Sequence, residues 1–329
     1  MPERRRNTKQ CKGGSSLRSA LSELRTAYGN ADALVRSYDR AAERSILFRG
    51  LAWLIERAYP ARAFLELAAD LDRDIATHGL QQACARVVER FIPRRETTIP
   101  AEAIPMLHAG GTILYGNHPS LVTPFLVGSC VERDDLRYVS TSYVCRLIPE
   151  LGTRAYPVEV ILDRKLTEYR RGGVMRVLAH SLVSRLHPLP DRAMQRERNA
   201  RSLAEATEHV RRGGALIICP DGGGVRSREW YEGIGRIVGN LHASGHANDV
   251  HVVPFWEGNS TNRRIYCQLR RSPWARLRYR VIARRPVLLR FGQPLSVAEV
   301  VTSQQTAAQT VGFLRRYYES QCIPAVELE

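Results

Sequence analysis

The chain has 329 residues, and 44% of them are hydrophobic, which is enough to bury a sizeable core in one large domain with an appendage or in two domains. Lysine and arginine outnumber aspartate and glutamate by 49 to 33, so the formal net charge is +16. Only Lys9, Lys12 and Lys165 are lysines; the excess is therefore arginine, whose planar guanidinium suits phosphate and carboxylate anions. This favours an anionic partner, although a GC-rich genome can also enrich a chain in arginine.

Cysteine usage and hydropathy exclude several protein classes. The seven cysteines are odd in number and form no Cys-x-x-Cys pair, which argues against a disulfide scaffold and a zinc site and fits a reducing cytoplasm. No run approaches the roughly twenty apolar residues of a membrane-spanning helix, and no apolar segment follows Arg4, Arg5 and Arg6 as a secretory signal requires. We therefore expect a cytoplasmic protein that is soluble or lies on a membrane surface.

The amino-terminal residues are predicted to form a tail and then helices. Residues 1–16 are polar and basic, which is typical of a disordered tail. Residues 17–92 show a helical apolar pattern, and Pro60 separates two predicted helices. The predicted apolar faces of these helices are Leu47, Leu51, Leu54 and Ile55, and Phe64, Leu67, Leu71 and Ile75.

Aromatic rings beside arginines give this helical region two interpretations. The side chains concerned are Phe48, Trp53, Arg49, Arg57 and Arg62. The combination is typical of an interfacial contact with a membrane. The alternative is a helical cap that packs on the next domain.

From residue 93 onward, short apolar strands alternate with helices. Strands are predicted at 112–115, 136–140, 215–219, 250–255 and 287–291. Residues 199–211 are predicted to form a helix that ends at the glycine pair 213–214, and residues 185–198 an irregular surface loop. The alternation predicts an α/β fold over 93–329, with a mixed sheet flanked by helices.

The most informative motif is NHPSLVT at residues 117–123, directly after the apolar run 112–116. A histidine just past the end of a buried strand is expected to be exposed and preorganised, and Pro119 is predicted to open a helix beside it. Such a helix start would disfavour the imidazolium and keep His118 available as a neutral general base near pH 7. A capping or core histidine is the alternative.

Four further motifs follow in chain order: GTRAYPV at 152–158, GGALIICPDGGGVRS at 213–227, VVPF at 252–255 and FGQPL at 291–295. Together with NHPSLVT they resemble the glycerol-3-phosphate and 1-acylglycerol-3-phosphate (lysophospholipid) acyltransferase family over roughly residues 97–297. The resemblance implies an acyltransferase-like domain. It also implies transfer of a fatty acyl group from an acyl-CoA or acyl-carrier-protein thioester to a lysophospholipid or glycerol-phosphate-type hydroxyl. These thioesters would be co-substrates, with no cofactor or metal, and the protein would work in phospholipid biosynthesis at an anionic inner membrane surface.

The family signature is Asn-His-x-Ser-x-x-Asp, in which the histidine takes the proton of the acceptor hydroxyl and the aspartate orients the imidazole and offsets its charge. The resemblance therefore implies a catalytic site of Asn117, His118, Ser120 and Thr123, with His118 as the base. Thr123 replaces the aspartate, and its hydroxyl can hold the ring but cannot offset a positive charge.

Three outcomes follow from this replacement: another carboxylate takes the place of the aspartate in space, catalysis is slow, or catalysis is lost. Asp134, Asp135 and Asp221 are the first candidates for such a carboxylate.

The glycine-rich segment has Pro-Asp-Gly-Gly-Gly-Val-Arg-Ser where the family has Pro-Glu-Gly-Thr-Arg-Ser. By resemblance it binds the acyl acceptor, because glycines let backbone N–H groups approach an anion closely. The residues implied are Asp221, Gly222, Gly223, Gly224, Arg226 and Ser227. The family also binds the acceptor phosphate with an arginine near the Pro-Val step, for which Arg154 and Arg164 are the candidates. A glycine turn without a ligand and unliganded arginines are the alternatives.

Between Arg263 and Arg290, arginines alternate with Tyr266, Trp274 and Tyr279. This mixture suits anionic headgroups, the phosphates of coenzyme A or an acidic carrier protein, and a solvated strand face is the alternative. Two other functions remain as alternatives to acyl transfer. One is a catalytically silent homologue that binds lipid or acyl thioester. The other is a nucleic-acid-binding protein, for which the chain has the charge but shows no recognition motif.

Overall fold

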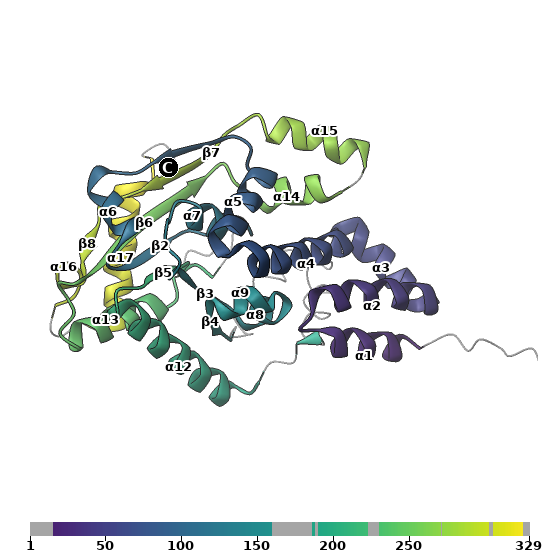
Figure 1. Cartoon of the computed structure of the whole chain (residues 1–329), viewed down its shortest axis with the longest axis horizontal. Coiled ribbons are helices and arrows are strands. Elements are labelled where there is room, and N and C mark those ends of the chain that lie inside the picture. Colours follow the sequence, from purple (N-terminus) through teal and green to yellow (C-terminus); the bar gives the residue numbers. More distant parts are fainter. Residues whose placement is uncertain are drawn as a thin grey trace, which may run out of the picture.

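The computed structural model describes residues 16–159, 186–187, 190–222, 230–270, 272–302 and 305–324. The chain forms a mixed eight-stranded sheet with helices on both faces, and a helical region precedes the sheet in sequence (Figure 1). The predicted α/β class, with a mixed sheet and an amino-terminal helical region, is confirmed. Of the predicted tail, only Ser16 lies within the described residues.

Five helices make up the amino-terminal region: α1 (Leu17–Ala27), α2 (Ala31–Arg44), α3 (Ile46–Ala58), α4 (Ala61–His78) and α5 (Leu80–Phe91). The hydroxyls of Ser16 and Ser45 cap α1 and α3, because each accepts a hydrogen bond from the backbone N–H three residues on. Pro60 separates α3 from α4, as predicted. Leu71 and Ile75, two residues of the predicted apolar face of α4, are buried.

The predicted apolar face of α3 is wrong in part. Ile55 is buried, but Leu47 and Leu54 are exposed. The side that packs against α2 instead carries Phe48, whose ring lies edge-on to Tyr38 with the ring centroids 5.5 Å apart. Because α3 has apolar residues on more than one side, their spacing alone does not show which side is buried.

The strands are β1 (Arg95–Thr98), β2 (Gly111–Gly116), β3 (Arg137–Thr141), β4 (Ala155–Val158), β5 (Ala215–Ile218), β6 (Val250–Gly258), β7 (Val287–Phe291) and β8 (Leu295–Ser296). Their order in the sheet is β1-β7-β6-β2-β5-β3-β4, and β8 pairs with β6. The strands from β6 to β4 are mutually parallel, whereas β7 and β8 run antiparallel to β6. All five predicted strands are present. The others are short, and β1 is exposed along its whole length, so no apolar run marked it.

The remaining helical segments are the 3₁₀ turn Ala101–Ala103, α6 (Ile104–His108), α7 (Thr123–Gly128), α8 (Ser142–Leu147), α9 (Pro149–Thr153), α12 (Arg192–Arg211), α13 (Gly233–Ala243), α14 (Asn262–Leu269), α15 (Pro273–Ile282), α16 (Val297–Val300) and α17 (Ala307–Cys322). The predicted loop at 185–198 is wrong from residue 192 onward. There α12 begins, and the Asp191 carboxylate caps it by accepting a hydrogen bond from the Met194 N–H. The arginine-rich stretch 263–290 is mostly α14 and α15 and not a strand face.

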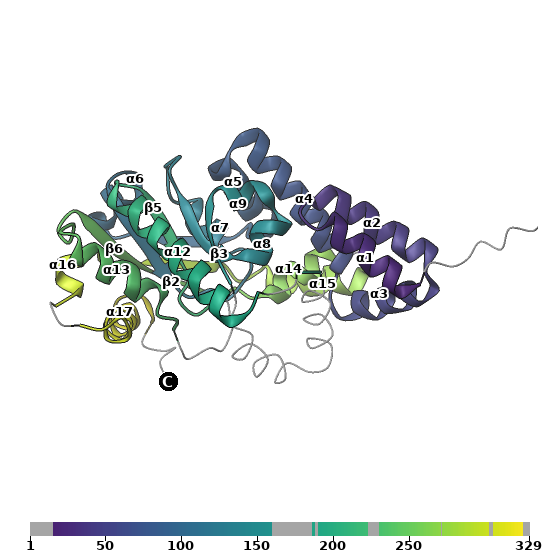
Figure 2. The same cartoon turned by 90° about the horizontal axis from the view of Figure 1, so that it is seen from below.

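Side chains of the sheet alternate between two cores. Leu114, Ile217 and Phe255 belong to the core that also contains the buried residues of α1 to α5 and α7. Tyr115 and Trp256, one residue further along their strands, belong to the core under α12, α13 and α17. The helical region and the sheet therefore share a core, although Figure 2 shows α1 to α4 extending to one side of the strands.

Candidate active site

Three neighbouring strands, β5, β2 and β6, end at the same edge of the sheet. They are parallel, so their carboxyl ends lie together, which is where open α/β sheets place ligand-binding residues. The pairing of β2 with β6 runs as far as Gly116 and Phe255. A Cβ atom on Gly116 would collide with the carbonyl oxygen of Phe255, so this close approach requires a glycine. The segment 117–122 leaves the sheet directly after this point.

The side chain of Asn117 fixes this segment to β6. Its Oδ1 accepts a hydrogen bond from the backbone N–H of Glu257, and its Nδ2 donates to the Glu257 carbonyl oxygen, both at 2.8 Å. His118 follows and is half-buried. Its backbone N–H donates to Oδ2 of Asp221 at 2.9 Å. The NHPSLVT segment and the Pro-Asp-Gly segment are therefore in direct contact.

The prediction that Pro119 opens a helix is wrong. Helix α7 begins at Thr123 and has Pro124 in its first turn. In the segment before α7, the backbone N–H of Leu121 donates to Oδ1 of Asn262 at 2.8 Å, which fixes this segment to the start of α14. His118 is therefore five positions before the helix start, too far for the helix dipole to act on its ring as predicted.

Thr123 is fully buried and locks the turn before α7. Its Oγ1 donates to the carbonyl oxygen of Ser120 at 2.8 Å and accepts from the Ser120 N–H at 3.2 Å. The two hydroxyl oxygens are 3.4 Å apart, and Ser120 is buried as well. Both side chains thus stabilise the backbone that carries His118. Neither supplies a negative charge.

A buried carboxylate that the sequence analysis missed lies at this corner. Glu257, near the end of β6, is 1% exposed, and within the described residues its carboxylate oxygens accept no hydrogen bond of good geometry. Burial raises the pKa of Glu257 to about 7, although the nearby hydroxyls of Ser260 and Thr123 and the guanidinium of Arg264 lower it. The signal in the sequence is a single acidic residue directly after the apolar run 252–256.

The chain turns after β6 and brings the guanidinium of Arg264 near the Glu257 carboxylate. Asn259 has φ +59°, a left-handed conformation that asparagine tolerates, and the chain then enters α14. Arg264 on α14 is 1% exposed and donates through Nη2 to the carbonyl oxygens of Ile282, at 3.2 Å, and Arg285, at 2.9 Å. Burial lowers the pKa of Arg264, and Glu257 acts in the opposite direction.

Of the three carboxylates considered first, one reaches the His118 segment. Asp221 is buried and contacts it through the backbone N–H of His118. Asp135 is exposed and accepts two hydrogen bonds from Arg133, at 2.8 and 2.6 Å, and Asp134 is exposed. Burial, with the carboxylates of Asp221 and Glu257, raises the pKa of the Cys219 thiol well above its ordinary value.

The predicted acceptor-binding residues are only partly placed. Gly222 has φ +66°, and a Cβ atom there would crowd the Tyr231 ring at 2.6 Å, so the turn after Asp221 requires glycine. Arg154 precedes β4 and donates to the carbonyl oxygen of Asp134 at 3.2 Å. Because β4 is parallel to its neighbours, Arg154 lies at the opposite edge of the sheet from His118. Outside the described residues lie Arg164, Gly223, Gly224, Arg226 and Ser227.

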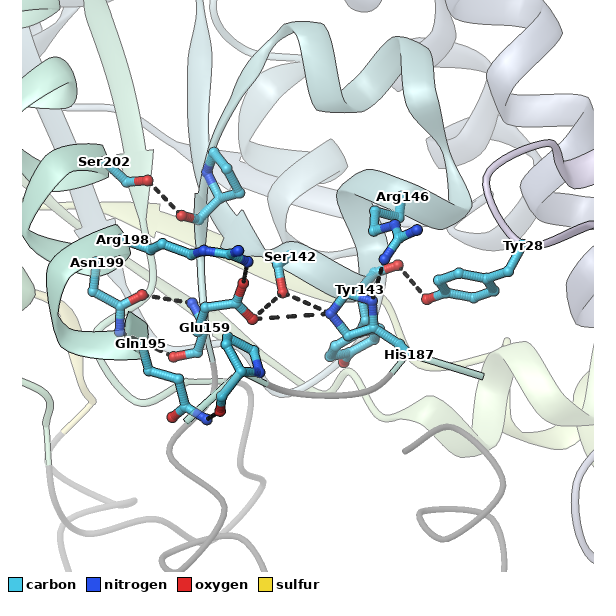
Figure 3. A network of polar contacts seen from close by, with 12 residues as sticks. Tyr28, Ser142, Tyr143, Arg146, Glu159, His187, Gln195, Arg198, Asn199 and Ser202 are labelled. Atoms are coloured by element: carbon cyan, nitrogen blue, oxygen red, sulfur yellow. Dashed lines mark hydrogen bonds and ion pairs between the residues drawn. The ribbon is translucent and has the colours of Figure 1, made fainter. Parts of the chain in front are cut away.

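A second buried polar cluster follows β4 (Figure 3). Ser142 donates to Oε2 of Glu159 at 2.6 Å, and its hydroxyl is 3.0 Å from Nε2 of His187. Arg198 lies 3.3 Å from Oε1 of Glu159, and Asn199 exchanges two hydrogen bonds with the Glu159 backbone, at 2.6 and 3.0 Å. Serine stands between carboxylate and histidine here, whereas a catalytic triad needs the histidine in the middle.

This cluster joins parts of the chain that are distant in sequence. Arg146 of α8 lies 3.5 Å from Nδ1 of His187 and also over the ring of Tyr28, which follows α1. The Tyr28 hydroxyl donates to the carbonyl oxygen of Tyr143 at 2.7 Å. Burial lowers the pKa of His187, and Glu159 opposes this effect. The arrangement ties α1, α8, β4 and α12 together.

Comparison of the chain with models of known protein families gives no match, and comparison with curated proteins gives none either. Within the described residues, no group of three or more His, Cys, Asp or Glu side chains is placed to hold a metal ion. None of the helices in the described part of the chain has the length and apolar character that a membrane crossing requires.

Proposed function

We propose that the protein is an O-acyltransferase. It moves a fatty acyl group from an acyl-CoA or acyl-carrier-protein thioester to the hydroxyl of a lysophospholipid or glycerol-phosphate-type acceptor, and His118 is the general base. One observation carries this proposal: His118 is half-buried at the carboxyl edge of the sheet, and its backbone is bound to Asp221 of the segment that by resemblance binds the acceptor. Base and acceptor segment would thus face the same substrate.

In this reaction the imidazole of His118 takes the proton of the acceptor hydroxyl while the oxygen attacks the thioester carbonyl. The carbon–sulfur bond then breaks, and the thiolate leaves and takes up the proton from the imidazolium. Two hydrogen bonds to β6 hold the neighbouring Asn117, which keeps the base in a fixed position. Backbone N–H groups at the corner can stabilise the developing oxyanion.

An anionic membrane surface is the proposed location, at the inner face of the membrane. Helix α3 exposes Ile46, Leu47 and Trp53, the last of which is 57% exposed and lies under the guanidinium of Arg57, 4.8 Å from the ring centroid. On α15, Trp274 is 74% exposed. Apolar rings beside arginines on a helix surface favour binding in the headgroup layer. Phe48 takes no part in this surface, because it is buried against α2.

The proposal is tested by measuring thioester consumption with purified protein, palmitoyl-CoA or acyl carrier protein, and lysophosphatidate or glycerol 3-phosphate as the acceptor. His118→Ala is expected to lower the rate by roughly 10²–10⁴-fold, which is typical for loss of a general base. His246→Ala serves as the matched control, since His246 is half-buried like His118 but pairs with the exposed Asp249. Acyl transfer that survives His118→Ala would refute the proposed base.

A catalytically silent homologue that binds lipid or acyl thioester is the second candidate. The observation that favours it is the Thr123 hydroxyl, which is engaged with Ser120 and offers no charge to the imidazole. Binding of acyl-CoA without any consumption, in the same preparation, would support this candidate.

A further inference from the structure

We infer that Glu257 is the acidic partner of His118 and takes, from β6, the positioning role that the family signature gives to the residue at position 123. This inference rests on the proposed function. It assigns to Glu257 an indirect part in the reaction, since the carboxylate would act on the imidazole and not on the substrate.

The register of the sheet brings the two residues together. Strands β2 and β6 are parallel, and their pairing ends at Gly116 and Phe255. His118 and Glu257 each follow two positions later. Side chains two positions apart point to the same face of a strand, so Glu257 on β6 lies on the face of Phe255 and Leu114. His118 follows the end of the neighbouring strand β2.

The chain stays bound to β6 beyond the end of β2. The two hydrogen bonds between the Asn117 side chain and the Glu257 backbone replace the strand contacts at this point. They hold the backbone of His118, the next residue, beside β6. The Nδ1 atom of His118 is buried, so this side of the ring faces the interior of the protein. The Glu257 carboxylate lies in the same interior.

The surroundings of Glu257 differ from those of a structural carboxylate. A buried charge is costly unless hydrogen bonds or an opposite charge compensate it, and in the described residues no donor meets the hydrogen-bond geometry to either oxygen. Four groups from other elements face this corner: Arg264 from α14, Asp221 and Cys219 from the end of β5, and Thr123 from α7. A carboxylate that is buried beside a single opposite charge, at the edge of a sheet, is a functional-site candidate.

The pair explains how the reaction tolerates threonine at position 123. When the imidazole takes the acceptor proton, a positive charge forms, and the Glu257 carboxylate offsets it in a poorly solvated site where charges interact strongly. The proton then passes to the leaving thiolate, so the ionisation of Glu257 is the same before and after the transfer.

The inference is tested with Glu257→Gln, which keeps the shape of the side chain and removes the charge. We expect kcat to fall by roughly 10²-fold or more with little change in KM, because positioning of a base acts in the transition state. Independently of activity, proton and nitrogen NMR should show the midpoint of the His118 imidazole titration moving to lower pH in Glu257→Gln. His118→Ala identifies the signal.

An unchanged His118 titration together with an unchanged kcat in Glu257→Gln would overturn the inference. If the wild-type protein transfers no acyl group, the proposed function fails, yet the NMR titration still decides whether the two residues are coupled. If Glu257→Gln does not fold, Glu257→Asp keeps the charge at a greater distance. It is then expected to retain part of the rate and to shift the titration by a smaller amount, and a titration identical to that of the wild type would contradict the pairing.

Discussion

Two buried glutamates lie at the ends of strands of the same sheet, and their surroundings are opposite. Glu159, after β4, is 7% exposed and has a donor for each oxygen, Ser142 for one and Arg198 for the other. Glu257, on β6, is 1% exposed and has the hydroxyls of its neighbours close by but no hydrogen bond of good geometry within the described residues. The first carboxylate holds elements together. The second keeps its capacity to accept a hydrogen bond, which is what the proposed partner of an imidazole base needs.

The two carboxylates are expected to differ in what they contribute to stability and to function. A satisfied buried carboxylate stabilises the fold and is costly to remove, because its donors are then left without partners. A buried carboxylate without good hydrogen bonds destabilises the fold, and carboxylates of this kind cluster at functional sites. Substitution of Glu159 and of Glu257 should therefore change stability and activity in different ways.

The largest expected effect is a pH dependence of stability that belongs to Glu257. Its pKa is raised from 4.5 to about 7 in the folded protein, so folding binds a proton in this range and the free energy of unfolding falls as the pH rises through it. The total change is about 3 kcal/mol, because each tenfold change in proton affinity corresponds to about 1.36 kcal/mol. Urea unfolding of the wild type and Glu257→Gln between about pH 4.5 and 8 measures it. If the free energy of unfolding changed with pH equally in both proteins, the raised pKa of Glu257 would be contradicted.

Removal of the satisfied carboxylate should destabilise the fold at every pH. Glu159→Ala removes the carboxylate that accepts from both the Ser142 hydroxyl and the Arg198 guanidinium, and the free energy of unfolding is expected to fall by about 2 kcal/mol. The same urea titration at pH 8 provides the measurement. Glu257→Gln is the matched control, and at that pH it should not destabilise the protein. If Glu257→Gln destabilised the protein at pH 8 and Glu159→Ala did not, Glu257 would be the structural carboxylate.

Features that depend on residues close together in the sequence could be predicted from it, and features that depend on distant residues could not. Apolar runs predicted β2, β5, β6 and β7, because a buried strand leaves a local pattern. The corner of His118 depends instead on the register between β2 and β6, and the Asn117–Glu257 contact spans 140 positions. No local pattern reports such a contact, so the sequence alone points to Asp134, Asp135 and Asp221 and not to Glu257.

A smaller effect is expected when the carboxylate is moved across the corner. Thr123→Asp in the Glu257→Gln background places an acid on α7 where the family signature has it, and should recover kcat by on the order of tenfold. In the wild-type background the same change should not raise kcat, because two carboxylates would then crowd one site. Steady-state kinetics of the three variants give the answer. A gain from Thr123→Asp alone would mean that Glu257 does not fill the role.

The smallest effect concerns one hydrogen bond in the cluster around Glu159. Ser142→Ala removes the 2.6 Å bond to Glu159 and is expected to cost about 1 kcal/mol of stability. Acyl transfer should stay within about twofold of the wild type, since α8 is not part of the His118 corner; kcat and the urea midpoint are compared in one preparation. A large loss of kcat without a loss of stability would place the catalytic chemistry at this second cluster.

If Glu257 acts on the reaction through His118, the effects of the two substitutions on kcat are not additive, and a double-mutant cycle measures this. The rates of the wild type, His118→Ala, Glu257→Gln and the double variant are compared under identical conditions. If the two residues act together, the double variant will be about as slow as His118→Ala alone, because the carboxylate has no role once the imidazole is gone. If Glu257→Gln lowers the residual rate of His118→Ala by the same factor as it lowers the wild-type rate, the two residues act independently and the account is contradicted.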